Sequence, residues 1–231
     1  MENMDNTELF LDKYKQLEDA ASNRFGEECS SQIARLERMP QFENVAAGLR
    51  YCREVRNLLQ HNPKIDGQYA VTPSESMLRL LENVMERVIN PPRACDAALK
   101  IQNIYHRGPD AAVLRTMRDM VKRDLSKIPI TQQGRVIGVF SQETLFSRAL
   151  STGLPPLTES TRLHELRDFL TIDRKYYRFA PYRAPLDEIE TIFDEAYARH
   201  IRIRSIFLTE NGKPDETLLG LITPWELIDK L

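Results

Sequence analysis

A chain of 231 residues with 42% hydrophobic content has room for one large domain or for two or three small ones. Charged residues make up 29% of the chain, yet the formal net charge is only -2, which excludes a generally basic nucleic-acid binder and an acidic-tail protein. Any contact with RNA or DNA would have to use a local basic patch.

The three cysteines are widely spaced and odd in number, so the sequence contains neither a disulfide framework nor a zinc-binding spacing. His106, His164 and His200 are isolated from one another, and no metal site is predicted. Residues 1–7 are polar and acidic and do not resemble a signal peptide. No apolar run is long enough to span a bilayer. These features predict a cytoplasmic protein without a membrane segment.

Residues 7–90 have the apolar spacing of helices throughout. A first amphipathic helix is followed by a shorter one that ends near Pro40, and a third runs from about Phe42 to Leu59. A fourth begins at the stretch 72–75, where Thr72 is the expected N-cap, and ends at the stiff linker 90–92. Four helices with short connections predict an antiparallel bundle.

A polar cluster of Arg56, Asn57 and His61 closes the third helix. Asn62 precedes Pro63 and is pushed away from helical backbone angles, so His61 is expected in the last turn or just after it. Arg56 lies five residues earlier, about 140° round the helix, so the arginine and histidine side chains do not share a face. They would flank one phosphate only if the helix end unwound or if a second copy supplied the partner group.

The pattern changes after the linker, and two similar rounds of elements follow. The first round has a helix over 110–124, strands over 128–130 and 136–140, and a helix over 141–150. After a linker over 152–161, the second round has a strand over 176–179, a helix over 185–199, strands over 201–208 and 218–222, and a helix over 224–231.

The core of the repeat is the alignment of residues 136–144 with residues 218–226. Each segment is an apolar strand with a glycine near its middle, closed by a hydroxyl residue that begins a helix. The hydroxyl residue has a polar partner three positions on, so that Ser141 pairs with Thr144 and Thr223 pairs with Glu226.

This repeat resembles a tandem pair of CBS domains, a Bateman module, over residues 94–231. In that family the hydroxyl commonly binds a nucleotide phosphate and an acid three positions on binds the ribose. The resemblance implies a regulatory adenine nucleotide, AMP, ADP or ATP, and a homodimer. The nucleotide-binding residues that it implies are Ser141, Thr144, Thr223 and Glu226, with the strand residues Ile128, Pro129 and Ile206.

The two repeats follow the family pattern to different degrees. Thr144 stands where the family has an acid, whereas Glu226 is nearer to the pattern. Pro129 matches the usual strand proline and Ile206 does not. The resemblance therefore favours the second repeat as the nucleotide site and leaves the first as an empty or altered one.

Helix capping explains the same residues without a ligand. Thr223 and Glu226 form a good capping box, and Ser141 needs no ligand to serve as an N-cap. The free N–H groups of a helix N-terminus are available to an anion in either case. Both interpretations stay open at this point.

Basic residues crowd the second repeat. They are either a solvated, salt-bridged face or a clamp for a polyphosphate, and the first interpretation is slightly favoured. The residues concerned are Arg174, Lys175, Arg178, Arg183, Arg199, Arg202 and Arg204.

The helical segment with Arg56, Asn57 and His61 resembles a HEPN domain over about residues 7–90. Members of that family are often metal-independent ribonucleases that act as dimers, with two motifs meeting across the interface. The resemblance implies cleavage of RNA, in which His61 moves a proton and Arg56 stabilises charge on the phosphate. Asn57 would orient the histidine or bond a phosphate oxygen.

These expectations combine in an α+β multidomain chain with a HEPN-like helical bundle over 1–90 and CBS repeats over 94–150 and 163–231. The main functional prediction is a homodimeric, nucleotide-regulated ribonuclease that acts on RNA. The alternative is a non-catalytic adenine-nucleotide sensor whose bundle mediates dimerisation or holds a partner.

Overall fold

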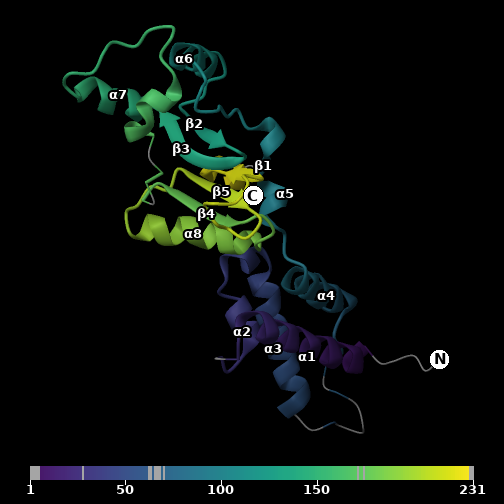
Figure 1. Ribbon diagram of the computed structural model, residues 1–231. Helices are drawn as coiled ribbons and strands as arrows, with labels where there is room; N and C mark the ends of the chain where they lie inside the picture. Colours follow the sequence, from purple (N-terminus) through teal and green to yellow (C-terminus); the bar gives the residue numbers. More distant parts are fainter. Residues whose placement is uncertain are drawn as a thin grey trace. The chain divides into compact units, whose positions relative to one another are not determined.

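The computed structural model divides into two compact units, Met1–Pro92 and Arg93–Leu231, each described here by itself (Figure 1). It describes residues 6–27, 29–61, 64, 69, 71–170, 172–173 and 175–228. The rest of the chain lies outside the described residues, including the N-terminal segment 1–5, most of the loop 62–70 with Asn62 and Pro63, Arg174, and the last three residues of the predicted final helix.

The first unit is helical. Its elements are α1 (Asn6–Phe25), α2 (Gln32–Leu36), the 3-10 helix η1 (Pro40–Val45), α3 (Ala46–His61) and α4 (Glu75–Ile89). The predicted third helix thus begins as a 3-10 turn and extends to His61. The predicted N-cap Thr72 is not the cap, because α4 begins at Glu75 and Ser74 takes the N-cap position.

One face of each helix of the first unit builds its core. In α1 the buried residues Phe10, Tyr14, Leu17 and Ala21 are three or four positions apart, which places them on one side of the helix. They pack with the buried faces of α3 and α4. Full burial of each large apolar side chain stabilises the fold by about 1.5–3 kcal/mol, so this shared core holds the helices together.

The second unit contains both helices and strands. Its first part has α5 (Ala94–Ala97), β1 (Leu99–Lys100), η2 (Ile101–Asn103), α6 (Val113–Lys122), β2 (Lys127–Gln132), β3 (Arg135–Ser141) and α7 (Gln142–Leu150). Its second part has η3 (Leu163–Phe169), β4 (Tyr177–Pro181), α8 (Leu186–Ala198), β5 (Ser205–Thr209), β6 (Gly220–Ile222) and α9 (Pro224–Ile228). The predicted order of helix, strand, turn, strand and helix is confirmed in both rounds.

The strands of the second unit form two sheets. One is the antiparallel hairpin of β2 and β3, closed by Gln133 and Gly134 at φ values of 51° and 80°. Two positive φ values in a two-residue turn match the twist of the flanking strands. The other sheet has the order β1-β6-β5-β4. Its strands β4 and β5 are parallel, and α8 connects them in the chain.

Two predicted strands of the second repeat are shorter in the structure. The strand predicted over 201–208 begins only at Ser205, because residues 201–204 lead from the end of α8 back to the sheet. There the Arg204 N–H donates to the carbonyl of Tyr176 at 2.7 Å. The strand predicted over 218–222 is confined to Gly220–Ile222.

The helices α6 and α8 end in the same way, which shows that the repeat is structural. Asp124 and His200 follow the two helices with φ values of 54° and 55°. After α6 the Leu125 N–H donates to the carbonyl of Met120 at 2.9 Å, and after α8 the Ile201 N–H donates to the carbonyl of Ala196 at 2.8 Å. This is the Schellman arrangement, and it aligns the two helices from their C-terminal ends.

Each repeat is completed by a segment that precedes the other repeat in the chain. Arg93, ahead of the first repeat, bridges to Pro185 at the start of α8, and Arg162, ahead of the second, bridges to Ala112 at the start of α6. Beside the first bridge the Ala94 N–H donates to the carbonyl of Ala184 at 2.8 Å, and beside the second the Leu163 N–H donates to the carbonyl of Ala111 at 3.0 Å. The two halves therefore exchange their leading segments.

The exchange explains the glycine in the middle of the repeated strand. A Cβ at Gly138 in β3 would lie 2.4 Å from the carbonyl oxygen of Leu170, in the segment that leads into the second repeat. A Cβ at Gly220 in β6 would lie 3.2 Å from the Cβ of Ala98, in the segment that leads into the first. The backbone of Leu170 leaves no room for a side chain at Gly138, whereas a side chain at Gly220 would make a tight contact with Ala98 and Leu99.

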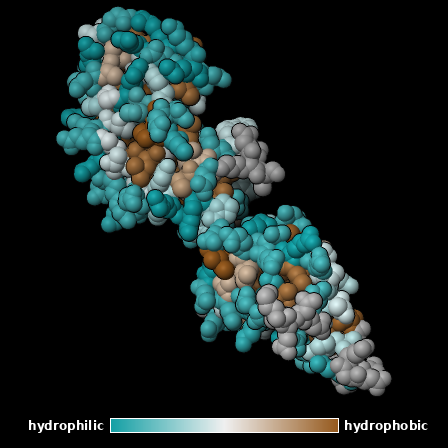
Figure 2. Space-filling view, turned by 90° about the vertical axis from the view of Figure 1, so that its right-hand side faces the viewer, coloured by the Kyte–Doolittle hydropathy of each residue, from teal (hydrophilic) through white to brown (hydrophobic). Residues whose placement is uncertain are grey.

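On the face of each unit that Figure 2 shows, most of the coloured surface is hydrophilic, and apolar residues form separate patches. Within the part of the chain that the structure describes, no helix combines the length and apolar character that crossing a bilayer requires.

Replacing Gly138 by alanine should lower the free energy of unfolding by about 1–3 kcal/mol, because the new methyl group overlaps the backbone of Leu170. Gly220→Ala should cost less, since its nearest contact is 3.2 Å away. Gly108→Ala is the control, because its Cβ would meet only the Thr131 oxygen at 3.8 Å. Denaturant unfolding followed by circular dichroism measures the three variants, and equal losses at Gly138 and Gly108 would contradict the close approach.

Candidate functional site

The hydroxyl residue of the first repeat, Ser141, caps a helix. Ser141 ends β3 and is the N-cap of α7. Its Oγ accepts from the Thr144 N–H at 3.4 Å, and the Thr144 Oγ1 accepts from the Ser141 N–H at 3.1 Å. Both residues are buried. In this repeat the capping interpretation accounts for the hydroxyl and its partner, as the replacement of the family's acid by Thr144 suggested.

The second repeat has a different arrangement at the equivalent place. The Thr223 N–H donates to a carboxylate oxygen of Glu226 at 2.7 Å, and the Thr223 hydroxyl donates to the same oxygen. The Thr223 Oγ1 in turn accepts from the Trp225 N–H at 3.3 Å. Both Thr223 and Glu226 are only half-buried, so this hydroxyl and carboxylate stay within reach of a ligand.

The predicted strand residues belong to the cores of the two repeats. The side chains of Ile128 and Ile206 are 1% and 0% exposed. Pro129 is also buried and lies in β2 opposite Val139. Side chains buried to this degree have no surface to offer a ligand in this arrangement. Any ligand contact at these strands would involve the backbone or a neighbouring residue.

A pair of basic residues and a pair of acids lie where the two repeats meet. Arg204 precedes β5 and donates to both carboxylate oxygens of Glu143, which stands at the start of α7 in the other repeat. Lys127 begins β2 and is half-buried. Burial and the positive charge of Arg204 lower the pKa of Lys127, while Glu143 and Glu226 oppose this effect. Lys127 therefore lies within electrostatic range of Arg204, Glu143 and Glu226.

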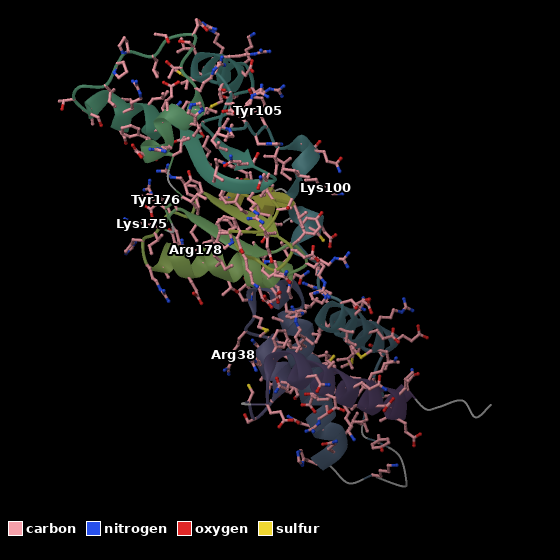
Figure 3. The ribbon with its side chains drawn as sticks, viewed as in Figure 1. Arg38, Lys100, Tyr105, Lys175, Tyr176 and Arg178 are labelled. Carbon is pink, nitrogen blue, oxygen red and sulfur yellow. The ribbon has the colours of Figure 1, made fainter. Side chains whose placement is uncertain are left out.

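Aromatic side chains hold Arg204 in place. Its guanidinium lies 4.5 Å from the ring centroid of Tyr176 and also forms a hydrogen bond with the side chain of the buried Tyr177. Lys175 lies 5.6 Å from the same Tyr176 ring, and Lys175, Tyr176 and Arg178 all come from the start of β4 and the residues before it (Figure 3). Of the basic residues predicted to form a solvated face or a clamp, Arg204 pairs with Glu143, and the exposed Arg199 lies 3.9 Å from a carboxylate oxygen of Glu195.

Sequence reasoning missed Lys127 and Glu143. The repeat alignment contained no signal for Lys127, because Lys127 is the first residue of β2 and the strand registers align it with Ser205, the first residue of β5. Glu143 carried no signal either, since Trp225 occupies the equivalent place in the second repeat. Only the pairing of the two halves brings Glu143 to Arg204.

The polar cluster of the first unit is spread over two environments. Arg56 is half-buried, donates to the Asn57 Oδ1 at 3.3 Å, and lies 5.5 Å from the ring centroid of Tyr14 in α1. His61 is exposed as the last residue of α3. Among the described residues no hydrogen bond or ion pair joins His61 to Arg56, so a single chain does not bring the guanidinium and the imidazole together.

Arg56 also lines a hollow of about 490 Å³ between α1 and α3. The hollow contains three carboxylates, and burial raises the pKa of one of them, Glu18, against the opposing charge of Arg56. A phosphate placed there would meet more negative charge than positive, which disfavours an anion. The lining residues are Leu11, Asp12, Tyr14, Lys15, Glu18, Asp19, Arg56 and Gln60.

Two of the three isolated histidines have ordinary side-chain partners. His106 bonds the Thr131 hydroxyl at 2.9 Å, and His164 lies 3.3 Å from a carboxylate oxygen of Asp110. Within the described ranges, no three histidine, cysteine, aspartate or glutamate side chains gather closely enough to hold a metal ion.

Comparison with known proteins finds similarity only at the level of the fold. No family model matches this chain, and no curated protein matches it. Among solved structures, similar chains are CBS-domain proteins that cover about three fifths of this chain.

Three of these structures illustrate the similarity. The CBS domain pair of protein MJ0100, in complex with 5′-methylthioadenosine and S-adenosyl-L-methionine, is 12% identical, covers 61% of this chain and 95% of its own, and has a TM-score of 0.42. CBSX2 in complex with AMP is 14% identical, covers 60% and 94%, and has a TM-score of 0.43. A CBS domain-containing protein from Bacillus anthracis is 10% identical, covers 60% and 91%, and has a TM-score of 0.44.

The ion pair between Glu143 and Arg204 should make stability depend on pH. Bonds from Arg204 are the largest influence on the pKa of Glu143 and hold it below its usual range. A carboxylate whose pKa is lower in the folded state adds stability above its unfolded pKa of about 4.3, and this stability is lost as the pH falls through the folded pKa.

We therefore expect Glu143→Gln to lower the free energy of unfolding at pH 7 by less than about 1 kcal/mol, because the Glu143 side chain is 61% exposed and solvent screens the pair. The difference from wild type should shrink as the pH is lowered toward about 3. Glu210→Gln, at an exposed position, is the control. A difference that does not change with pH would contradict the ion pair.

Proposed function

We propose that this chain is a regulatory protein whose second unit binds an adenine nucleotide at the second repeat, where the two repeats meet. The observation that carries the proposal is the half-buried Lys127, whose positive charge is disfavoured by burial and by Arg204. An anion bound beside Lys127 would relieve this cost, since a partly desolvated cation gains most from a nearby opposite charge.

The residues divide the tasks by their chemistry. The Thr223 hydroxyl is suited to a phosphate oxygen, and the Glu226 carboxylate is suited to the two hydroxyls of a ribose, which are hydrogen-bond donors. Lys127 supplies positive charge from the first repeat. Binding would then involve groups from both halves, so that a nucleotide would favour the arrangement of the repeats that it fits best.

The first repeat is the weaker candidate for a second nucleotide. Ser141 and Thr144 are buried and satisfy each other, and Glu143 holds Arg204. A phosphate at this position would have to displace the Glu143 carboxylate from Arg204. We therefore expect one nucleotide for each chain.

Isothermal titration calorimetry of the full chain tests the proposal. AMP is the first probe, with ADP, ATP and S-adenosyl-L-methionine beside it, because AMP and S-adenosyl-L-methionine are bound in two of the similar structures. Glu226→Ala and Lys127→Met should each weaken binding by about tenfold or more, since a hydrogen bond to a charged group is worth about 1.5–3 kcal/mol. Thr144→Ala is the matched control in the first repeat.

The variant Thr223→Ala separates a ligand contact from a helix cap. Weaker binding supports the contact with the nucleotide. A loss of stability with unchanged affinity would assign Thr223 to capping alone. No heat with any adenine nucleotide, from a folded protein, would overturn the proposal.

The ribonuclease hypothesis is a second candidate, and it rests on Arg56, Asn57 and His61. The feature in its favour is that Asn57 and His61 are exposed at the end of α3, where a second copy can reach them. The hypothesis requires such a copy, because Arg56 is turned toward α1 and Tyr14 within its own chain.

Cleavage of a labelled RNA in the presence of a chelator tests this second candidate. The hypothesis expects His61→Ala to reduce the rate by about 100-fold or more, as for other proton-transfer groups. Gln60→Ala, at the neighbouring exposed position, is the control. Arg56→Ala is less informative, since the loss of its packing on Tyr14 also destabilises the fold. Equal rates for wild type and His61→Ala, with and without nucleotide, would exclude the enzyme and leave the regulatory protein.

A further inference from the structure

The hollow between α1 and α3 has the chemistry of a cation site. Its volume of about 490 Å³ lies within the range of about 300–1,000 Å³ that small-molecule sites occupy. Carboxylates only accept hydrogen bonds, so a ligand here has to bring donors, and the excess of negative charge favours a cation. The charged lining has three carboxylates and two cations, which belong to Asp12, Glu18, Asp19, Lys15 and Arg56.

The two cations leave these carboxylates without ion pairs. The Arg56 guanidinium lies 5.5 Å from the ring centroid of Tyr14 and donates to the Oδ1 of Asn57. Lys15 is exposed, and its long flexible side chain can turn toward solvent. Within the described ranges, neither cation forms an ion pair with a carboxylate of the hollow. A ligand cation therefore has acceptors left to bind.

Glu18 is the carboxylate that gains most from such a ligand. It is half-buried, and in the described part of the chain its side chain accepts no hydrogen bond. Burial raises its pKa, the charge of Asp19 raises it further, and the charge of Arg56 opposes both effects. A cation placed beside Glu18 would favour its charged form.

The Tyr14 hydroxyl is a second group that points to a ligand, and it is independent of the acids. Tyr14 lines the hollow and is only 3% exposed, yet its hydroxyl has no hydrogen-bond partner among the described residues. Burial and then the charge of Glu18 raise its pKa, so the hydroxyl lies within electrostatic range of Glu18. Buried polar groups normally have a partner, and a phenolic oxygen can accept from an N–H donor in the hollow.

The acids lie toward two ends of the hollow. Asp12 and Asp19 are seven residues apart on α1, which separates them by about 10 Å along the helix axis at about 1.5 Å per residue. Glu18 adjoins Asp19. One compact cation cannot reach both ends, whereas a linear chain with an ammonium group at each end can.

We propose that this hollow binds a linear aliphatic polyamine, with one ammonium group at Glu18 and Tyr14 and another toward Asp12. The aliphatic stem would lie along Leu11 and the Tyr14 ring, which are apolar parts of the lining. A lysine side chain of a partner protein carries the same chemistry but only one ammonium group. The inference rests on neither proposed function, because it concerns the first unit and requires no nucleotide and no RNA.

Isothermal titration calorimetry of the full chain with spermidine tests the proposal. We expect one spermidine for each chain. Butylamine, which has a single ammonium group, should bind about tenfold more weakly or less, since it loses the hydrogen bonds at one end. A tetralysine peptide represents the protein source of the same chemistry, and tighter binding of the peptide than of spermidine would overturn the choice of a free polyamine.

Charge removal within and outside the hollow shows whether binding is specific. Glu18→Gln keeps the size of the side chain and should weaken spermidine binding by about tenfold or more. Glu8→Gln is the matched control, because it removes the same charge from an exposed position of α1 outside the hollow. Equal affinities for wild type and Glu18→Gln, or equal losses in the two variants, would overturn the proposal.

The variant Tyr14→Phe separates a ligand contact from a structural role. It should weaken spermidine binding and leave the free energy of unfolding unchanged, because the hydroxyl has no partner to lose in the free protein. Denaturant unfolding followed by circular dichroism measures stability and verifies that each variant is folded. A less stable Tyr14→Phe with the affinity of wild type would assign the hydroxyl to the fold and contradict its role in the site.

Discussion

The second unit depends on the exchange of leading segments between its two repeats. A two-stranded hairpin such as β2 and β3 is marginal by itself and needs cover from other elements. The segment from Arg162 to Leu170 provides part of that cover, although it leads into the other repeat. Neither repeat is complete without the other's segment, so the two halves must fold as one unit.

The close approach at Gly138 follows from this exchange. The backbone of Leu170 passes so near to β3 that no side chain fits between them. The equivalent approach at Gly220 is looser, and β1 continues it by pairing with β6. The two repeats therefore share the same close approach, but the contact is tighter at Gly138 than at Gly220. They also differ in their polar pairs, which are Ser141 with Thr144 and Thr223 with Glu226.

The same relation places charges from both halves at one location. Arg204 is held by Glu143 and by Tyr176 and Tyr177, while Lys127 is half-buried and interacts with Glu226 more weakly than with Arg204 or Glu143. Glu143 of the first repeat therefore pairs with Arg204 of the second repeat, whereas Lys127 of the first repeat lies within electrostatic range of Glu226 in the second. In the first unit, by contrast, Arg56 is used for packing on Tyr14 beside several carboxylates, and that environment does not suit a phosphate.

The sequence by itself determined the helical character of the first ninety residues, the repeat of the second half, and the two hydroxyl pairs at Ser141 and Thr223. These features are local, since apolar spacing and helix caps depend on residues only a few positions apart. Only the tertiary structure decided that the leading segments are exchanged, that Glu143 meets Arg204, that Ile128 and Ile206 are core residues, and that Arg56 packs on Tyr14 of α1. These contacts join residues far apart in the chain, and no local pattern encodes which distant backbone or charge a side chain will meet.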